Sequence, residues 1–546
     1  MARIFLSYRR DDSKHVAVHL RERLIASFGN DSVFLDMSEL PHGSPFPEEI
    51  DEAIKTCAVF FALIGNNWLG SSWRLGRRFR IRQPGDWVRH EIAQALRLGK
   101  FILPILIDGA RMPSKRVLPQ EIKTFAELNA AKIRTETFAD DFTELEGELW
   151  RRLHDQYGVS ELVARKYHRI PAIDDFFGRF AGPNAIYSNQ GWRLDRLEVG
   201  IGFTDPALNR WLCADRPTVP IVVSNQRWLA VERYPHGREL RSFIVHNAIR
   251  RSLHMFNDKK IRLSSEISIG TPVKLQETDY ESSLMTDQIA QDVVVSNELG
   301  PDGHTPRITI WTGIDKFSRF DDASGAITVL DFSDTGMSNQ LGGSTLAFTR
   351  DGSLIVVVGN QLNLQSPRML APSGSGSCDW DDIEDARDLL TVAIRGAGRE
   401  LQEECSLQPS YPGERNVAFA LWPLAFTRML HRGGKPEMYF LGFVDAEMSE
   451  LIHRKRERYV AAVVPAVKVR PIDWSSEPVA PSIERACADY LKQLRSIGRI
   501  EGRLVQVSAP LEHGLKLLIE ACQDAACSRS ITNFANASMT RWAWVP

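Results

Sequence analysis

Residues 4–12 read Ile-Phe-Leu-Ser-Tyr-Arg-Arg-Asp-Asp, an apolar run that changes abruptly into a charged one. The apolar part predicts a short buried strand, and the acidic residues with Ser13 are typical of a helix start. Apolar residues then recur at helical spacing until Gly29-Asn30. The same alternation continues, with strands expected at 33–36, 58–65 and 101–107 and helices at 48–56 and 86–98. This order predicts a parallel sheet covered on both faces, whose ligands bind beyond the carboxyl ends of the strands.

Several segments of this region, taken in order, resemble the motifs of bacterial TIR domains. They are residues 4–12, Val33-Phe-Leu-Asp36 with Gly43, Ile50 and Ala53-Ile54, and Asp86-Trp-Val-Arg-His-Glu-Ile92. The resemblance covers residues 1–155 and implies a flavodoxin-like parallel-sheet domain. Many TIR domains cleave NAD at the nicotinamide–ribose bond, and Glu91 matches their catalytic glutamate. A fixed anion there would stabilise the oxocarbenium-like ribosyl centre. An exposed helical acid is the competing interpretation.

Five further residues are candidate substrate contacts. Tyr8 and Arg9 follow the first strand, where an adenine or a phosphate could stack or pair. Asp36 ends the second strand and is a candidate for holding its loop or facing the ribose. Trp68 and Trp87 are candidates for lining a nicotinamide pocket, with burial in the core as the competing interpretation.

Two segments bear on partners of this region. Residues 37–47 match a loop that docks on a neighbouring TIR domain, so the resemblance implies self-association and activity that depends on assembly. The basic run over 74–82 could meet phosphates, but a solvated loop is the preferred interpretation.

A helix with three glutamates on one face is expected in the last part of the chain. It covers residues 388–405 and ends in Arg399-Glu-Leu-Gln-Glu-Glu-Cys-Ser-Leu407. Glu400, Glu403 and Glu404 are spaced i, i+3, i+4, so their carboxylates share a face. Such oxygen ligands suit Mg²⁺ bound with a diphosphate, and a solvated acidic face is the alternative. Nearby we expect a hairpin turn at 351–352, a loop at 372–377 and a strand at 438–443.

This helix resembles the second half of the box of Nudix domains, which hydrolyse nucleoside diphosphates linked to another moiety. The first half departs, because Thr391 and Asp385 stand where the box has Glu and Gly, and Ser406 replaces a later Gly. The resemblance covers residues 301–475. It implies a pocket for an ADP-ribose-like or other nucleotide ligand, which is either cleaved or only bound.

We therefore expect an α/β chain of three parts. They are a TIR domain over 1–155, an intermediate α+β region of unknown role over 163–300, and a Nudix-like domain with a C-terminal helical extension over 301–546. The intermediate region is expected to contain a strand at 220–224 and a helix at 288–294, and the extension helices at 482–494 and 511–524.

Composition limits the classes of partner and compartment. The net charge of −2 over 546 residues gives no overall attraction to nucleic acid or to a membrane surface. The seven cysteines include no CxxC pair, and no apolar run approaches the roughly 18 residues of a membrane span. We expect a soluble cytoplasmic protein with nucleotide-sized ligands, while a polymer trigger stays open.

The leading functional interpretation is an NAD⁺ glycohydrolase that releases nicotinamide and ADP-ribose or a cyclic variant. By resemblance it is an antiphage-defence effector activated by assembly, whose Nudix-like region senses or regulates through a nucleotide. One alternative is a bifunctional enzyme whose Nudix site hydrolyses ADP-ribose with Mg²⁺. The other is a non-catalytic TIR adaptor.

Overall fold

The computed structural model describes residues 4–28, 33–35, 46–70, 79–250, 257–359, 369–409, 415–452, 460–465, 469–494, 499–500, 503–504 and 506–542. The chain forms two compact units. The N-terminal unit comprises residues 1–160 and 245–255, and the C-terminal unit comprises residues 161–244 and 256–546.

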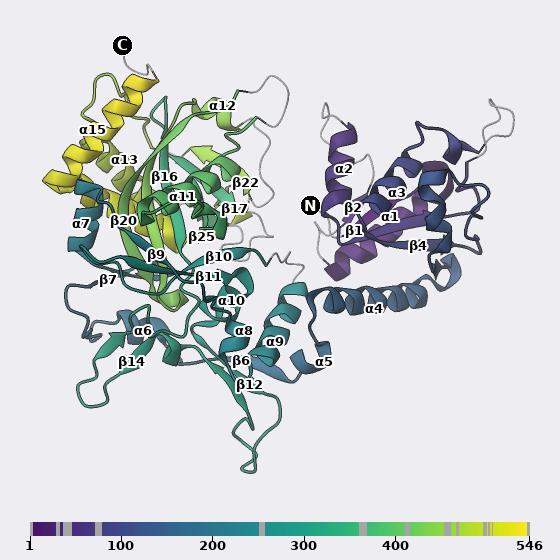
Figure 1. The fold of residues 1–546 in the computed structure, drawn as a ribbon, viewed down its shortest axis with the longest axis horizontal. Coiled ribbons are helices and arrows are strands. Elements are labelled where there is room, and N and C mark those ends of the chain that lie inside the picture. Colours follow the sequence, from purple (N-terminus) through teal and green to yellow (C-terminus); the bar gives the residue numbers. More distant parts are fainter. Residues whose placement is uncertain are drawn as a thin grey trace. The chain divides into compact units, whose positions relative to one another are not determined.

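A five-stranded parallel sheet lies at the centre of the N-terminal unit (Figure 1). Its strands are β1 (Ile4–Ser7), β2 (Val33–Leu35), β3 (Val59–Ile64), β4 (Phe101–Ile107) and β5 (Ala131–Ile133). Its helices are α1 (Arg10–Phe28), α2 (Phe46–Thr56), α3 (Trp87–Arg97) and α4 (Phe138–Tyr157). The strand order β2-β1-β3-β4-β5 is that of flavodoxin-like sheets, which confirms the predicted fold class.

The apolar runs of the sequence form the core of this unit. Every residue of β1 and β3 is buried, as expected for a parallel sheet with both faces covered. Phe5 stacks on Phe34 and Phe60, with ring centroids 5.2 and 5.1 Å away. The strands are therefore fixed against one another near the point where the chain leaves β1.

A six-stranded mixed sheet organises the C-terminal unit, in the order β19-β16-β21-β20-β8-β7. Its strands are β7 (Arg193–Arg196), β8 (Ile201–Thr204), β16 (Gly342–Thr349), β19 (Gly374–Ser377), β20 (Phe419–Met429) and β21 (Lys435–Val444). Gly343 approaches Ala397 of helix α11 (Leu389–Glu404), and Leu346 approaches Gly514 of helix α14 (Ala509–Gln523). Because residues 343 and 346 face opposite sides of β16, the two helices cover opposite faces of the sheet.

A four-stranded sheet, β22-β17-β18-β25, lies beside this one. Its strands are β17 (Ile355–Gly359), β18 (Met369–Ala371), β22 (Val460–Pro465) and β25 (Gln506–Val507). The predicted hairpin turn joins the two sheets, since β16 and β17 are bridged only at Phe348 and Leu354 among the described residues before they diverge. Gly352 has a φ of +77° there, which suits glycine.

Shorter elements complete the C-terminal unit. Its small sheets contain β6 (Tyr167–Pro171), β9 (Ile221–Val223), β10 (Lys259–Leu263), β11 (Val273–Asp279), β12 (Asp292–Ser296), β13 (Thr309–Thr312), β14 (Ser318–Phe320), β15 (Ile327–Val329), β23 (Arg499–Ile500) and β24 (Arg503–Leu504). Its other helices are α5 (Glu161–Ala164), α6 (Phe176–Ala181), α7 (Pro206–Asp215), α8 (Ala230–Arg233), α10 (Tyr280–Met285), α12 (Met448–Ile452), α13 (Val479–Leu494) and α15 (Ala525–Arg541). Helix α9 (Gly237–Arg250) contains residues of both units.

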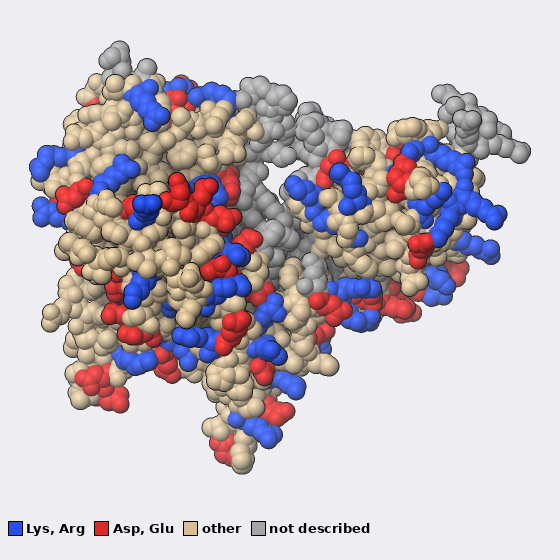
Figure 2. Space-filling model, in the orientation of Figure 1, with Lys and Arg blue, Asp and Glu red and all other residues tan. Residues whose placement is uncertain are grey.

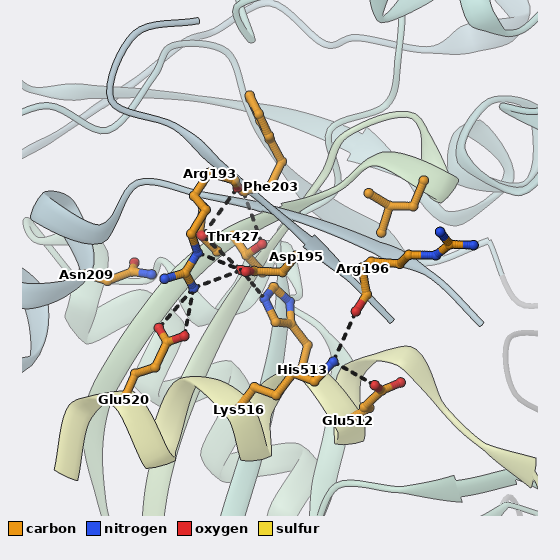
Figure 3. A network of polar contacts seen from close by, with 12 residues as sticks. Arg193, Asp195, Arg196, Phe203, Asn209, Thr427, Glu512, His513, Lys516 and Glu520 are labelled. Carbon is orange, nitrogen blue, oxygen red and sulfur yellow. Dashed lines mark hydrogen bonds and ion pairs between the residues drawn. The ribbon is translucent and has the colours of Figure 1, made fainter. Parts of the chain in front are cut away.

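The boundary expected at residue 300 falls inside the C-terminal unit. Strands β7 and β8 belong to the intermediate region of the sequence, yet they extend the sheet formed by β16, β20 and β21. Figure 3 shows how β7 is held to α14: Asp195 accepts hydrogen bonds from His513 and Arg193, at 3.0 and 2.9 Å, and Arg193 also pairs with Glu520. Burial raises the pKa of Asp195, but these two partners outweigh it and hold the pKa at about 2.

Three local expectations differ from the structure. Residues 292–294, the last part of the helix predicted over 288–294, belong to strand β12, because its valines pair with β6 and β13. Residues 374–377, part of a predicted loop, form edge strand β19 against β16. Residues 525–541 form a further helix, α15, which was not predicted.

Two surface properties bear on possible partners, namely the distribution of charge and the hydropathy of the helices. Figure 2 shows acidic and basic side chains interspersed over the parts of both units that it displays. Within the described ranges, no helix has the length and apolar character needed to cross a membrane.

Candidate active site

Glu91 lies at the carboxyl end of β1. Helix α3 buries one face, formed by Val88, Glu91, Ile92 and Ala95, so Glu91 is only 2% exposed. The hydroxyl of Ser7, the last residue of β1, donates a hydrogen bond of 2.5 Å to Glu91 Oε2. A carboxylate is therefore held inside the unit, beside the strand end where flavodoxin-like sheets bind ligands. The interpretation of Glu91 as an exposed acid does not fit this burial.

A buried ion pair ties the N-terminus of α3 to the segment after β1. Arg9 donates to both carboxylate oxygens of Asp86, at 2.9 and 3.1 Å, and its Nε donates to the carbonyl of Trp68 at 2.7 Å. Asp86 also caps α3 by accepting from the backbone N–H of Arg89. Arg9 is 3% exposed, so its guanidinium contacts Asp86 and Trp68 rather than the solvent where a phosphate would approach.

The turn after β3 is fixed by a second carboxylate. Asp12 accepts hydrogen bonds from the backbone N–H groups of Gly65 and Asn67, at 2.8 and 2.7 Å. Because Ser7 pairs with Ala62 of β3, these contacts surround the point between β1 and β3 at which the order of the strands reverses.

The other candidate substrate contacts differ in their burial. Trp68 is buried in the core and stacks on Phe125, with centroids 5.6 Å apart, whereas Trp87 is 38% exposed at the start of α3. Tyr8 is buried next to Arg9. Asp36, the loop over 37–45 and residues 74–78 of the basic run lie outside the described residues.

A family model of the TIR domain matches residues 4–146. Residues 4–146 form a TIR domain. Among solved structures, the chain is similar to the TIR domains of the activated Roq1 resistosome recognising the pathogen effector XopQ, at 16% identity and a TM-score of 0.21, over 27% of this chain and 96% of that one. It is also similar to DR0079 from Deinococcus radiodurans, at 10% identity and a TM-score of 0.20, over 37% and 96%.

The site of the TIR domain thus joins predicted residues to others that the sequence analysis missed. Glu91 and Arg9 were predicted, but their partners Ser7 and Asp86 were not singled out. Asp86 carries a detectable signal, because an Asp before a helix is a frequent N-cap. Ser7 carries none, because a serine inside an apolar strand gives no indication of its distant partner.

In the C-terminal unit, the three predicted glutamates have separate environments. Glu404 is buried and accepts a 2.9 Å hydrogen bond from the backbone N–H of Ser375. Glu400 pairs with Arg399 at 2.8 Å, and the half-exposed Glu403 lies 4.0 Å from the same guanidinium. Burial raises the pKa of Glu400 to about 7, although Arg399 lowers it. Arg399 is thus a central contact of this cluster.

The cluster around Arg399 does not fit a magnesium ion. Arg399 also pairs with Asp379 at 3.0 Å and Asp382 at 3.3 Å, and Lys260 forms a further ion pair with Asp379. Protein cations therefore already neutralise these carboxylates. In the described part of the chain, no three His, Cys, Asp or Glu side chains are grouped so that they could hold a metal ion. The expected Mg²⁺ site is not supported.

Proposed function

We propose that the TIR domain is an NAD⁺ glycohydrolase with Glu91 as its catalytic carboxylate. The observation that carries this proposal is the buried Glu91, held by Ser7 at the carboxyl end of β1 within a sheet of flavodoxin-like order. Acidic residues on helices are ordinarily exposed to solvent. A buried carboxylate at the ligand-binding edge of a sheet therefore supports a catalytic role.

The expected reaction breaks the bond between the ribose C1′ and the nicotinamide nitrogen. Nicotinamide leaves with the bonding electron pair. Water then adds to C1′ and loses a proton to solvent to give ADP-ribose, or a nucleophilic group of the ADP-ribosyl moiety adds instead, with loss of its own proton where it carries one, and gives a cyclic product. Positive charge develops on the ribose in the transition state. Glu91 stabilises that charge, because a fixed carboxylate in a site with little water interacts strongly with a nearby cation.

We further propose that the TIR domain becomes active on assembly and serves in antiphage defence. The support is its resemblance to assembling TIR enzymes through residues 37–47, of which only the last two are described. A non-catalytic adaptor remains the alternative, and NAD⁺ turnover separates the two.

The decisive experiment follows nicotinamide release from NAD⁺ by the full-length protein, over a range of protein concentrations. We expect release that increases more than linearly with protein concentration, and loss of about three orders of magnitude in Glu91→Gln. Glu127→Gln is the matched control, because this exposed acid of the same unit pairs only with Lys115 among the described contacts. Absence of nicotinamide at every concentration, including those at which the protein self-associates, would leave the adaptor interpretation.

For the C-terminal unit we propose a regulatory role in which a Nudix-like region binds a nucleotide without cleaving it. Ser406 has a φ of +54°, a conformation that favours the glycine of the Nudix box. This conformation supports the resemblance of the segment after α11 to the Nudix box. The neutralised carboxylates around Arg399 favour binding over metal-dependent hydrolysis.

Product analysis tests this second proposal. Incubation of the protein with ADP-ribose and Mg²⁺ should give no AMP, while calorimetry with ADP-ribose should detect binding in the wild type. Production of AMP that vanishes in Glu403→Gln would restore the bifunctional enzyme. Absence of heat with ADP-ribose and with other adenine nucleotides would contradict a nucleotide-binding role.

A further inference from the structure

We infer that Ser7 is a positioning residue, which fixes the carboxylate of Glu91 for reaction with NAD⁺. This inference rests on the proposed glycohydrolase function and deepens it. Ser7 and Glu91 are 84 positions apart in the sequence, yet their side chains meet at 2.5 Å. Ser7 is fully buried and Glu91 is 2% exposed, so water competes little for this hydrogen bond.

The donor stands on a rigid element. Ser7 belongs to β1, which is hydrogen-bonded to β2 on one side and to β3 on the other. The acceptor stands on α3, whose first turn is tied to the segment after β1 by the ion pair of Arg9 and Asp86. The backbones at Ser7 and Glu91 are therefore fixed, and the remaining freedom lies in the side-chain torsions of Glu91.

A hydrogen bond from Ser7 restricts those torsions. A glutamate has three side-chain torsions, and fixing them costs free energy that the transition state would otherwise have to supply. A hydroxyl that donates to a carboxylate forms a charge-assisted hydrogen bond and favours the ionised acid. Ser7 thus keeps Oε2 in one place, without contacting the substrate itself.

The test compares three substitutions of Ser7 with a matched serine in the full-length protein. Ser7→Ala removes the hydroxyl, Ser7→Cys keeps the size but provides a weak donor, and Ser7→Thr retains the hydroxyl. Ser13→Ala is the control, because Ser13 is equally buried and its hydroxyl contacts a backbone carbonyl instead. Nicotinamide release gives kcat and KM for each variant, and circular dichroism verifies that each is folded.

We expect kcat to decrease about 10- to 100-fold in Ser7→Ala and Ser7→Cys, with KM changed less than about threefold, because the lost contact matters in the transition state. Ser7→Thr should recover most of kcat, and Ser13→Ala should resemble the wild type. If Ser7→Ala fails to fold, Ser7→Cys carries the test.

The outcomes separate the two proposals. An active wild type with folded Ser7→Ala and Ser7→Cys variants of unchanged kcat overturns the role of Ser7 and leaves the glycohydrolase intact. An increase in KM at constant kcat also overturns it, because Ser7 would then act on substrate binding. A wild type that releases no nicotinamide in any assembled state overturns the glycohydrolase, and the role of Ser7 with it.

Discussion

Arg9 illustrates how a residue expected to bind substrate serves the structure around the site. Its guanidinium uses Nε for the carbonyl of Trp68 and both terminal nitrogens for Asp86. A bidentate pair of this kind has a defined geometry, which orients the first turn of α3 and thereby Glu91. The planar fork, rather than the charge alone, explains why an arginine suits this position.

Substitution of Arg9 by Met should destabilise the N-terminal unit by about 3–5 kcal/mol, because the 1%-exposed carboxylate of Asp86 would lose its main partner. Hydrogen–deuterium exchange of a peptide covering β3 measures this unit alone and should accelerate at least about a hundredfold. Lys115→Ala, which breaks the exposed pair with Glu127, is the control and should cost less than about 1 kcal/mol. Equal exchange in the two variants would contradict the role of Arg9.

Glu400 predicts a pH dependence for the C-terminal unit. Its folded pKa of about 7 lies above its ordinary value of 4.5, because burial disfavours the charged form. The stability that Glu400 contributes is therefore complete below pH 4.5 and is lost as the pH rises through 7.

Replacement by Gln removes this titration, so the melting temperature of Glu400→Gln relative to the wild type should be higher at pH 8 than at pH 4.5. The exposed Glu298, paired with Arg307, provides the control, and Glu298→Gln should show no such trend. A difference between Glu400→Gln and the wild type that is independent of pH would show that Glu400 titrates normally.

At the scale of elements, β19 shows what small residues allow. A side chain at Gly374 would lie 2.6 Å from the Cα of Leu401, and one at Gly376 would meet the carboxylate of Glu400. Glycine at these positions lets the edge strand lie directly against helix α11. The small residues that favoured a loop prediction over 372–377 therefore allow close packing, and four of these residues form a regular strand.

Gly374→Ala should destabilise the C-terminal unit by about 1–3 kcal/mol, because the added methyl group meets backbone that cannot move aside. Gly147→Ala is a useful contrast, since Gly147 is in helix α4 with no atom near the added carbon, and it should stabilise the N-terminal unit by about 0.5–1 kcal/mol. Thermal unfolding followed by calorimetry measures both. An unchanged melting temperature for Gly374→Ala would mean that β19 and α11 separate easily.

At the scale of the whole molecule, the C-terminal unit is continuous across residue 300. Strands β7 and β8 complete its six-stranded sheet, and Arg193 and Asp195 join β7 to α14. Removal of residues before 301 would expose the edge of β20 and leave His513 without its carboxylate partner.

We therefore expect a fragment of residues 161–546 to be monodisperse and to unfold cooperatively, while a fragment of residues 301–546 aggregates. Size-exclusion chromatography and limited proteolysis distinguish the two, since an exposed sheet edge promotes association. A soluble 301–546 fragment with a cooperative melt would support the boundary expected from the sequence.

The sequence by itself determined most elements of the TIR domain, although not β5, and marked Glu91 as a candidate carboxylate. Buried strands appear as short apolar runs, helices as repeats of 3.6 residues with capping residues, and Glu91 as part of a local motif, so all are encoded within about ten neighbouring positions. The same local signals correctly predicted α11, α13 and α14. They failed for β12 and β19, where pairing with distant strands outweighed local preference.

Only the tertiary structure decided which distant residues meet. The contact of Ser7 with Glu91, the pairing of Arg9 with Asp86 and the joining of β7 to α14 span 84, 77 and 318 positions. Such contacts depend on how the faces of helices and sheets pack together, and they produce no periodic pattern in the sequence. The same holds for Glu400, Glu403 and Glu404, whose spacing placed them on one helix face, while Arg399 and Ser375 determined that they do not act as one metal site.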